Sequence, residues 1–113
     1  MSAAVNLLPN FERRLKRLAR KFRSLGDEVE ALLERLEAQP VQGFSLGNGL
    51  YKIRLGSASK GGGKRGGFRV VTYYVEQTAE GEVVYLVTIY DKSEEANILK
   101  TDLLNTLKEE LGQ

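Results

Sequence analysis

The sequence predicts an α+β fold with one small antiparallel sheet and three helices, in the order (β)ααβββα. Apolar residues recur at helical spacing in residues 9–39 and again near the C-terminus, and three stretches between them have the composition of strands. The 113 residues suffice for one hydrophobic core, and no repeat or long linker divides them. We therefore expect a single domain over residues 1–113, with the helices packed on one face of the sheet.

The N-terminal third predicts a short strand over residues 4–8, followed by two helices. The apolar stripe of the first helix consists of Phe11, Leu15, Leu18, Phe22 and Leu25, and that of the second of Val29, Leu32, Leu33 and Leu36. We expect Gly26 to end the first helix and Asp27 to cap the second, with Glu30 completing a capping box. The short junction between them predicts an antiparallel helical hairpin.

The remaining elements follow a loop that glycine and asparagine predict over residues 41–49. Three strands are expected over residues 50–55, 68–75 and 82–90, and a last helix that Thr101 or Asp102 caps. In the first of these strands Tyr51, Ile53 and Leu55 alternate with Leu50, Lys52 and Arg54. Since successive side chains of a strand point to opposite faces, Lys52 and Arg54 should share one face.

Composition excludes several classes of function. The chain has no cysteine and no histidine, which removes thiolate zinc sites, cysteine nucleophiles and the most common general base. No apolar run is long enough to span a membrane, and the N-terminus lacks the pattern of a signal peptide. We therefore expect a cytoplasmic protein that uses neither a metal nor a cofactor.

Positive charge is concentrated in two places, although the net charge is only +2. Residues 11–23 carry seven basic side chains and one acid, and residues 52–69 carry six basic side chains and no acid. Glycine-rich basic loops bring backbone N–H groups close to phosphates, but a solvated hairpin loop has the same composition. A basic helix face can likewise contact RNA or simply be solvated. The loop does not match a Walker motif, since Ala58 replaces the first glycine and Arg65 follows Gly63-Lys64.

The strand ends predict a groove on the sheet face away from the helices. Its expected lining is Arg54, Lys60, Lys64, Arg65, Arg69, Tyr90 and Lys92. Clustered cations with an interleaved aromatic residue suit single-stranded nucleic acid, because cations follow the phosphates and a ring stacks on a base. Tyr73 is a further candidate for RNA contact, although a strand tyrosine more often packs against the core.

Three segments together resemble the RelE/HigB branch of the RelE/ParE toxin superfamily: Y-K-I-R-L from residue 51, S-K-G-G-G-K-R-G-G-F-R-V-V-T-Y-Y from residue 59, and L-V-T-I-Y-D-K-S-E from residue 86. The segment L-P-N-F-E-R-R-L-K-R-L is also similar to the first helix of these toxins. The resemblance covers roughly residues 5–108. It implies a small sheet with an N-terminal helical hairpin and a C-terminal helix.

The resemblance implies the toxin of a type II toxin–antitoxin pair, a ribosome-dependent endoribonuclease that cleaves messenger RNA without a metal. Its implied partners are a cognate antitoxin, the ribosome and mRNA, and the protein would be a monomer or a toxin–antitoxin hetero-oligomer. The residues that match the catalytic positions are Arg54, Arg69, Tyr90 and Lys92, and Lys52 matches a neighbouring basic position. Ile98 stands near the place where RelE has an active-site tyrosine. Lys60 and Lys64 are candidates for the base instead.

Two other functions are compatible with the same sequence. A ParE-like toxin would share the fold but act on DNA gyrase without cutting RNA. A degenerate member would bind RNA or its antitoxin without cleavage, and the residue at Ile98 is compatible with this interpretation. The cluster of basic residues on the predicted sheet favours the nuclease over both.

Overall fold

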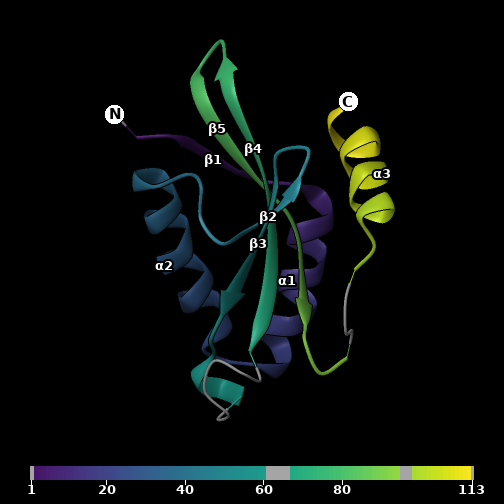
Figure 1. The fold of residues 1–113 in the computed structure, drawn as a ribbon. Coiled ribbons are helices and arrows are strands. Elements are labelled where there is room, and N and C mark those ends of the chain that lie inside the picture. The colour runs from purple at the N-terminus through teal and green to yellow at the C-terminus, as the bar shows by residue number, and fades with distance from the viewer. Residues whose placement is uncertain (1, 61–66, 95–97, 113) are drawn as a thin grey trace.

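The computed structural model describes residues 2–60, 67–94 and 98–112 and shows a five-stranded sheet with helices on both faces (Figure 1). The strands are β1 (Ala4–Leu7), β2 (Phe44–Gly47), β3 (Leu50–Leu55), β4 (Phe68–Thr78) and β5 (Gly81–Asp91). The helices are α1 (Pro9–Lys21), α2 (Leu25–Ala38) and α3 (Lys100–Leu111), with a single 3₁₀ turn, η1 (Ala58–Lys60), after β3. None of the described helices is long and apolar enough to cross a membrane.

The sheet has the strand order β1-β5-β4-β3-β2. Strands β2 to β5 pair antiparallel with their neighbours, and β1 pairs with β5 in parallel. This confirms the predicted α+β class and the central meander of three strands. The turn between β4 and β5 is shorter than the interval between the strands predicted over residues 68–75 and 82–90, because pairing continues to Thr78 and Gly81.

The helices divide between the two faces of the sheet, so the prediction that they pack on one face is wrong. Helices α1 and α2 bury Phe11, Leu18 and Leu32 on one face against β3, β4 and β5. Helix α3 packs Leu103 and Leu107 on the other face. Both faces of β4 and β5 are therefore covered, which explains why the sequences of these strands are nearly continuous apolar runs.

Several element boundaries also differ from the prediction. Helix α1 ends at Lys21, and Gly26 lies inside the first turn of α2 instead of ending α1. The N-cap of α2 is Ser24, and its side chain makes no capping hydrogen bond; Asp27 lies within the first turn. The N-cap of α3 is Leu99, so neither Thr101 nor Asp102 caps this helix.

Strand β2 occupies part of the segment that was predicted to be a loop. Asn48 and Gly49 form the two-residue turn between β2 and β3, and their φ angles are 56° and 79°. Positive φ at both central residues is what a type I′ hairpin turn requires, and Asn-Gly is the dipeptide that adopts it most readily. The same Asn and Gly residues that suggested a loop therefore close a hairpin.

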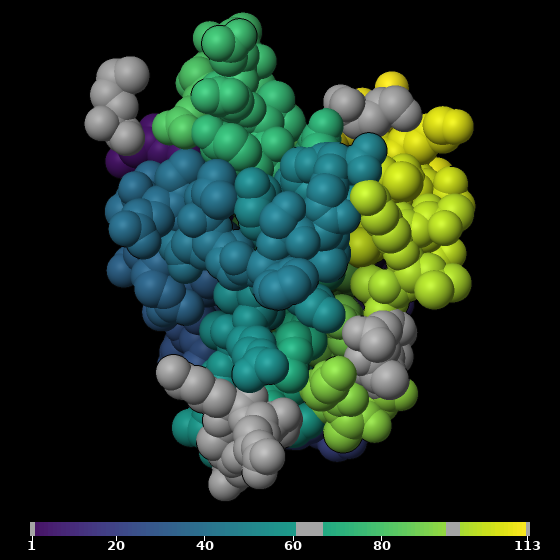
Figure 2. Space-filling view, viewed as in Figure 1, coloured from purple at the N-terminus to yellow at the C-terminus, as the bar shows by residue number. Residues whose placement is uncertain are grey.

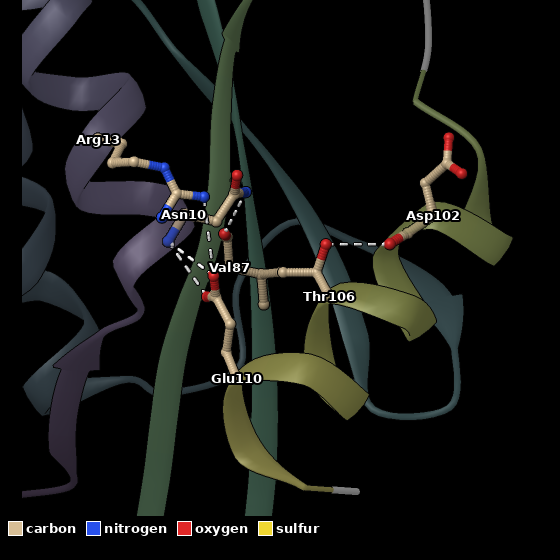
Figure 3. A network of polar contacts seen from close by, with 6 residues as sticks. All are labelled: Asn10, Arg13, Val87, Asp102, Thr106 and Glu110. Atoms are coloured by element: carbon tan, nitrogen blue, oxygen red, sulfur yellow. Dashed lines mark hydrogen bonds and ion pairs between the residues drawn. The ribbon is translucent and has the colours of Figure 1, made fainter.

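Helix α3 is fixed to the start of α1 by a polar network (Figure 3). The backbone N–H of Asn10 donates to both carboxylate oxygens of Glu110 at 3.1 Å, and Arg13 lies 3.9 Å from the same carboxylate. The Asn10 side chain donates to the carbonyl of Val87 at 3.0 Å, at the irregularity in the β4–β5 pairing. Because the first N–H groups of a helix lack intrahelical acceptors, Glu110 satisfies one of them and also faces the positive end of the α1 dipole.

Replacing Glu110 by alanine should lower the free energy of unfolding by about 1 kcal/mol, since a helix N-terminus loses its acceptor. Urea unfolding of the full chain measures this change. The matched control is Glu109→Ala, which removes an exposed carboxylate from the same turn of α3. Equal stability of the two variants would contradict a structural role for the Glu110–Asn10 contact.

Candidate nucleic-acid site on the sheet

A row of the side chains predicted for the site crosses the sheet through the pairing of β3, β4 and β5. Arg54 lies directly opposite Arg69, and Arg69 lies directly opposite Tyr90. Directly paired residues of antiparallel strands point to the same face. Lys52 lies two residues before Arg54 and points to that face as well, as the alternation in the sequence predicts.

Four basic side chains line one pocket of about 330 Å³ on this face. Its described lining consists of Phe44, Lys52, Arg54, Arg69 and Lys92, and none of these is acidic. The structure thus brings together four of the residues predicted for the site. The pocket lies on the α3 face of the sheet, so the expectation that the groove occupies a face without helices is wrong.

Arg69 differs from the other cations because it is only 6% exposed. Its Nη1 donates to the carbonyl oxygen of Phe68 at 3.3 Å. The guanidinium group carries five N–H donors in a fixed plane, so it can hold this contact and still offer donors to a ligand. Arg54 is exposed, and Lys52 and Lys92 are half-buried.

The two tyrosines predicted for the site serve as packing residues. Tyr90 is 1% exposed and lies in the cluster of apolar residues beneath α3, so its ring is not open for stacking on a base. Tyr73 stacks on Tyr85, with ring centroids 6.2 Å apart, and lines a different pocket beside α3. The stacking role predicted for Tyr90 is therefore wrong, and the packing alternative holds for Tyr73.

Lys60 does not line the pocket. Its ammonium group forms an ion pair with the carboxylate of Asp91, and the two side chains are 11% and 3% exposed. The same ammonium lies 5.5 Å from the ring centroid of Phe22 and 5.2 Å from that of Phe68, within the range of cation–π attraction. Phe68 belongs to the core cluster of α1 and α2, so Lys60 faces that side of the sheet and the prediction that it lines the groove is wrong.

The other residues of the basic loop are Lys64 and Arg65, and both lie outside the described residues. The chain is anchored on either side of them. Before residue 61, the Ala58 N–H donates to Glu28 and the Ser59 N–H donates to Ser24, at 2.8 and 3.0 Å. After residue 66, a side chain at Gly67 would lie 2.3 Å from the carbonyl oxygen of Leu55, so only glycine fits there.

Sequence reasoning missed Phe44, which is 73% exposed and lines the same pocket. It is paired with Lys52 across β2 and β3, so both side chains point to the α3 face. The available signal was the F-S-L segment before Asn48-Gly49, which is typical of a hairpin strand.

The described residues contain no group of three or more carboxylates, histidines or cysteines placed to hold a metal ion. The Asp91 carboxylate instead interacts with hydrogen-bond donors. Burial raises its pKa, but hydrogen bonds from Lys60 and from the Ser93 backbone and hydroxyl outweigh burial and hold the pKa below its ordinary value of 3.8. This carboxylate therefore joins the end of β5, immediately before Lys92, to the start of the glycine-rich segment.

Because folding lowers the pKa of Asp91, its ionised form stabilises the protein above pH 3.8, and this contribution is lost as the pH falls through the folded-state pKa. Asp91→Asn should lower the free energy of unfolding at neutral pH by about 3 kcal/mol, because it leaves the Lys60 ammonium without its carboxylate. It should also remove this part of the acid dependence. Urea unfolding between about pH 2.5 and 7 tests both effects. Glu94→Gln, which changes an exposed carboxylate nearby, is the control; indistinguishable pH profiles for Asp91→Asn and the wild type would contradict this account.

No protein-family model matches the sequence. Among solved structures, the fold is similar to that of a mutant of the E. coli toxin RelE in the free state, with a TM-score of 0.55 and 17% sequence identity. The similarity covers 85% of this chain and 90% of the RelE chain. The chain therefore has a RelE-like fold.

Proposed function

We propose that this chain is the toxin of a type II toxin–antitoxin pair and cleaves messenger RNA on the ribosome, in the manner of HigB-like members of the RelE group. The observation that carries the proposal is the position of Arg54 directly opposite Arg69, in a pocket that Lys52 and Lys92 also line. The RelE-like fold supports it. A surface with four cations and no acid in its described lining fits the phosphate backbone of RNA.

The pairing of two arginines has a physical consequence for the free protein. Like charges on directly opposite strand residues repel. Burial also raises the free energy of the charged guanidinium group of Arg69 when no anion lies beside it. A phosphate between the two guanidinium groups removes this repulsion and accepts charge-assisted, bidentate hydrogen bonds. The arrangement is therefore better suited to binding an anion than to stabilising the free protein.

The reaction that we propose uses the RNA as its own nucleophile. The 2′-oxygen gives its proton to a general base, for which Lys64 stays the predicted candidate, and forms a bond to the adjacent phosphorus. The bond from phosphorus to the 5′-oxygen breaks, and that oxygen takes a proton. The products are a 2′,3′-cyclic phosphate and a 5′-hydroxyl. Arg69 would hold the phosphate and neutralise the added charge of the transition state, with Arg54 beside it and Lys92 protonating the leaving oxygen.

The ribosome would supply the orientation that so small a site lacks, since holding the reacting atoms in line accounts for much of the catalysis in such a reaction. A second basic surface supports this part of the proposal. Arg13, Lys16, Arg17 and Arg20 line a shallow hollow along α1, and in this proposal they would contact ribosomal RNA without sequence preference. An antitoxin segment of acidic character would neutralise the basic pocket in the inactive complex.

Arg54→Ala should reduce cleavage by about 10²–10³-fold, because the transition state loses one of its stabilising donors. The assay is cleavage of a defined message on purified, programmed ribosomes by the full chain. Arg54 is the suitable position, because its side chain is exposed and the substitution should leave the fold intact. The matched control is Arg35→Ala, which removes an exposed arginine from α2.

Equal cleavage by Arg54→Ala and Arg35→Ala would show that the pocket takes no part in the reaction. If the wild type cuts no message yet arrests growth, the ParE-like function on DNA gyrase would replace this proposal. If the wild type neither cuts nor arrests growth, a degenerate binding protein would replace it.

A further inference from the structure

We infer that Phe44 is the stacking platform of the site, on which one base of single-stranded RNA lies while the adjacent cations hold its phosphates. This inference rests on the proposed function, which supplies RNA as the ligand. It assigns to β2 a role that the sequence pattern placed on Tyr90. Three independent features of the structure support it: the exposure of the ring, the fixed position of its backbone, and the absence of another open ring in the described lining of the pocket.

Phe44 is more exposed than the other large apolar residue of β2. The side chain is 73% exposed, although Leu46, in the same strand, packs against the core beneath α3. A phenylalanine at an edge strand gains nothing for stability when its ring stays in water. A single exposed apolar residue is ordinary by itself, so the neighbourhood of the ring decides the argument.

That neighbourhood is the basic pocket. Phe44 is directly opposite Lys52 in the β2–β3 pairing and lines the pocket together with Arg54, Arg69 and Lys92. Figure 2 shows the segment coloured for the β2 region at the surface of the molecule, with α3 beside it. The Phe44 side chain is 73% exposed, so its ring is open to a ligand. An aromatic ring adjoining a row of cations is the combination by which proteins bind single-stranded nucleic acid, since any base can stack on the ring.

The backbone that carries the Phe44 ring is held in a defined place. Gly43, the preceding residue, has a φ of +88°, and a Cβ there would lie 2.3 Å from the carbonyl oxygen of Lys52. Only glycine allows this close approach of β2 to β3. The position of Phe44 is therefore set by the sheet, which limits the entropy that is lost when a base stacks on it.

The other aromatic side chains near the site are already occupied by packing. Tyr90 is 1% exposed, and Tyr73 is stacked on Tyr85. Phe22 and Phe68 face the opposite side of the sheet, where their rings pack edge to face with centroids 5.1 Å apart. Phe44 is thus the aromatic residue of the described pocket lining that is open to a base.

The chain contains no tryptophan, so Phe44→Trp creates a single fluorescent reporter at the stacking position. The probe is a 2′-O-methyl oligoribonucleotide of about eight uridines, within the length that one such binding surface spans. It lacks the nucleophilic hydroxyl and is not cleaved. Binding of the oligonucleotide should quench the indole fluorescence of Phe44→Trp. The quenching should occur over the same concentrations at which the fluorescence anisotropy of a dye-labelled copy of the oligonucleotide rises. The control is Leu104→Trp, which places the reporter on exposed α3 outside the pocket and should not be quenched.

Affinity provides the second measurement. Phe44→Ala should weaken binding of the oligonucleotide by about 10-fold, as expected for loss of one base–aromatic stack. Phe44→Trp should retain wild-type affinity. For an oligomer of the same length made of abasic units, which keeps the phosphates and lacks the bases, wild type and Phe44→Ala should bind equally.

The outcomes separate this inference from the proposed function. The inference is wrong if the oligonucleotide binds and Arg54→Ala weakens binding, while Phe44→Ala has no effect and the fluorescence of Phe44→Trp is not quenched. The basic pocket would then remain an RNA site without a stacking platform on β2. If neither the oligonucleotide nor programmed ribosomes bind the wild type, the proposed function itself fails and the inference falls with it.

Discussion

The register between β3 and β4 is the constraint on which the candidate site depends. It places Arg54 opposite Arg69, and the adjoining register of β5 places Tyr90 next in the row. A shift of one residue would turn Arg54 toward the core of α1 and α2 and bring Ile53 into the pocket. The apolar residues that alternate with the cations, Ile53, Leu55, Phe68 and Val70, are buried on that opposite face. Burial of these four side chains therefore holds two like charges side by side in a position that repulsion opposes.

The two faces of the sheet differ in how much of their surface the helices cover. On one face α1 and α2 cover the larger core, and Lys60 and Asp91 tie the start of the glycine-rich segment to the end of β5. On the other face α3 covers only part of the surface and leaves the pocket open beside it. Helix α3 is held there by Leu103 and Leu107 and by the Glu110–Asn10 contact (Figure 3). The structure thus combines a closed hydrophobic side with a side that is partly basic and accessible.

Much of the fold followed from local patterns, and the errors have physical causes. Alternation in residues 50–55 correctly placed Lys52 and Arg54 on one face, since strand geometry alone decides this. The face that α3 covers was not predictable, because β4 and β5 are apolar on both sides and no local pattern says which helix covers which side. Lys60 resembles one more cation of a basic loop, and only the tertiary structure reveals that it pairs with Asp91. Phe44 was missed because its strand was taken for a loop, and the sequence offered only the Asn48-Gly49 turn as a signal.

The central claim is that Arg69 and its neighbours act on the backbone of messenger RNA, and mapping of 5′ ends in bacteria that express the chain tests it most directly. The comparison is between the wild type and Arg69→Lys, which keeps the charge of a buried position but loses the planar, bidentate donors. We expect new 5′-hydroxyl ends at in-frame positions of translated messages with the wild type, and their loss with the variant at equal protein level. In-frame ends of equal abundance from both proteins, or growth arrest by the wild type without any new ends, would contradict it.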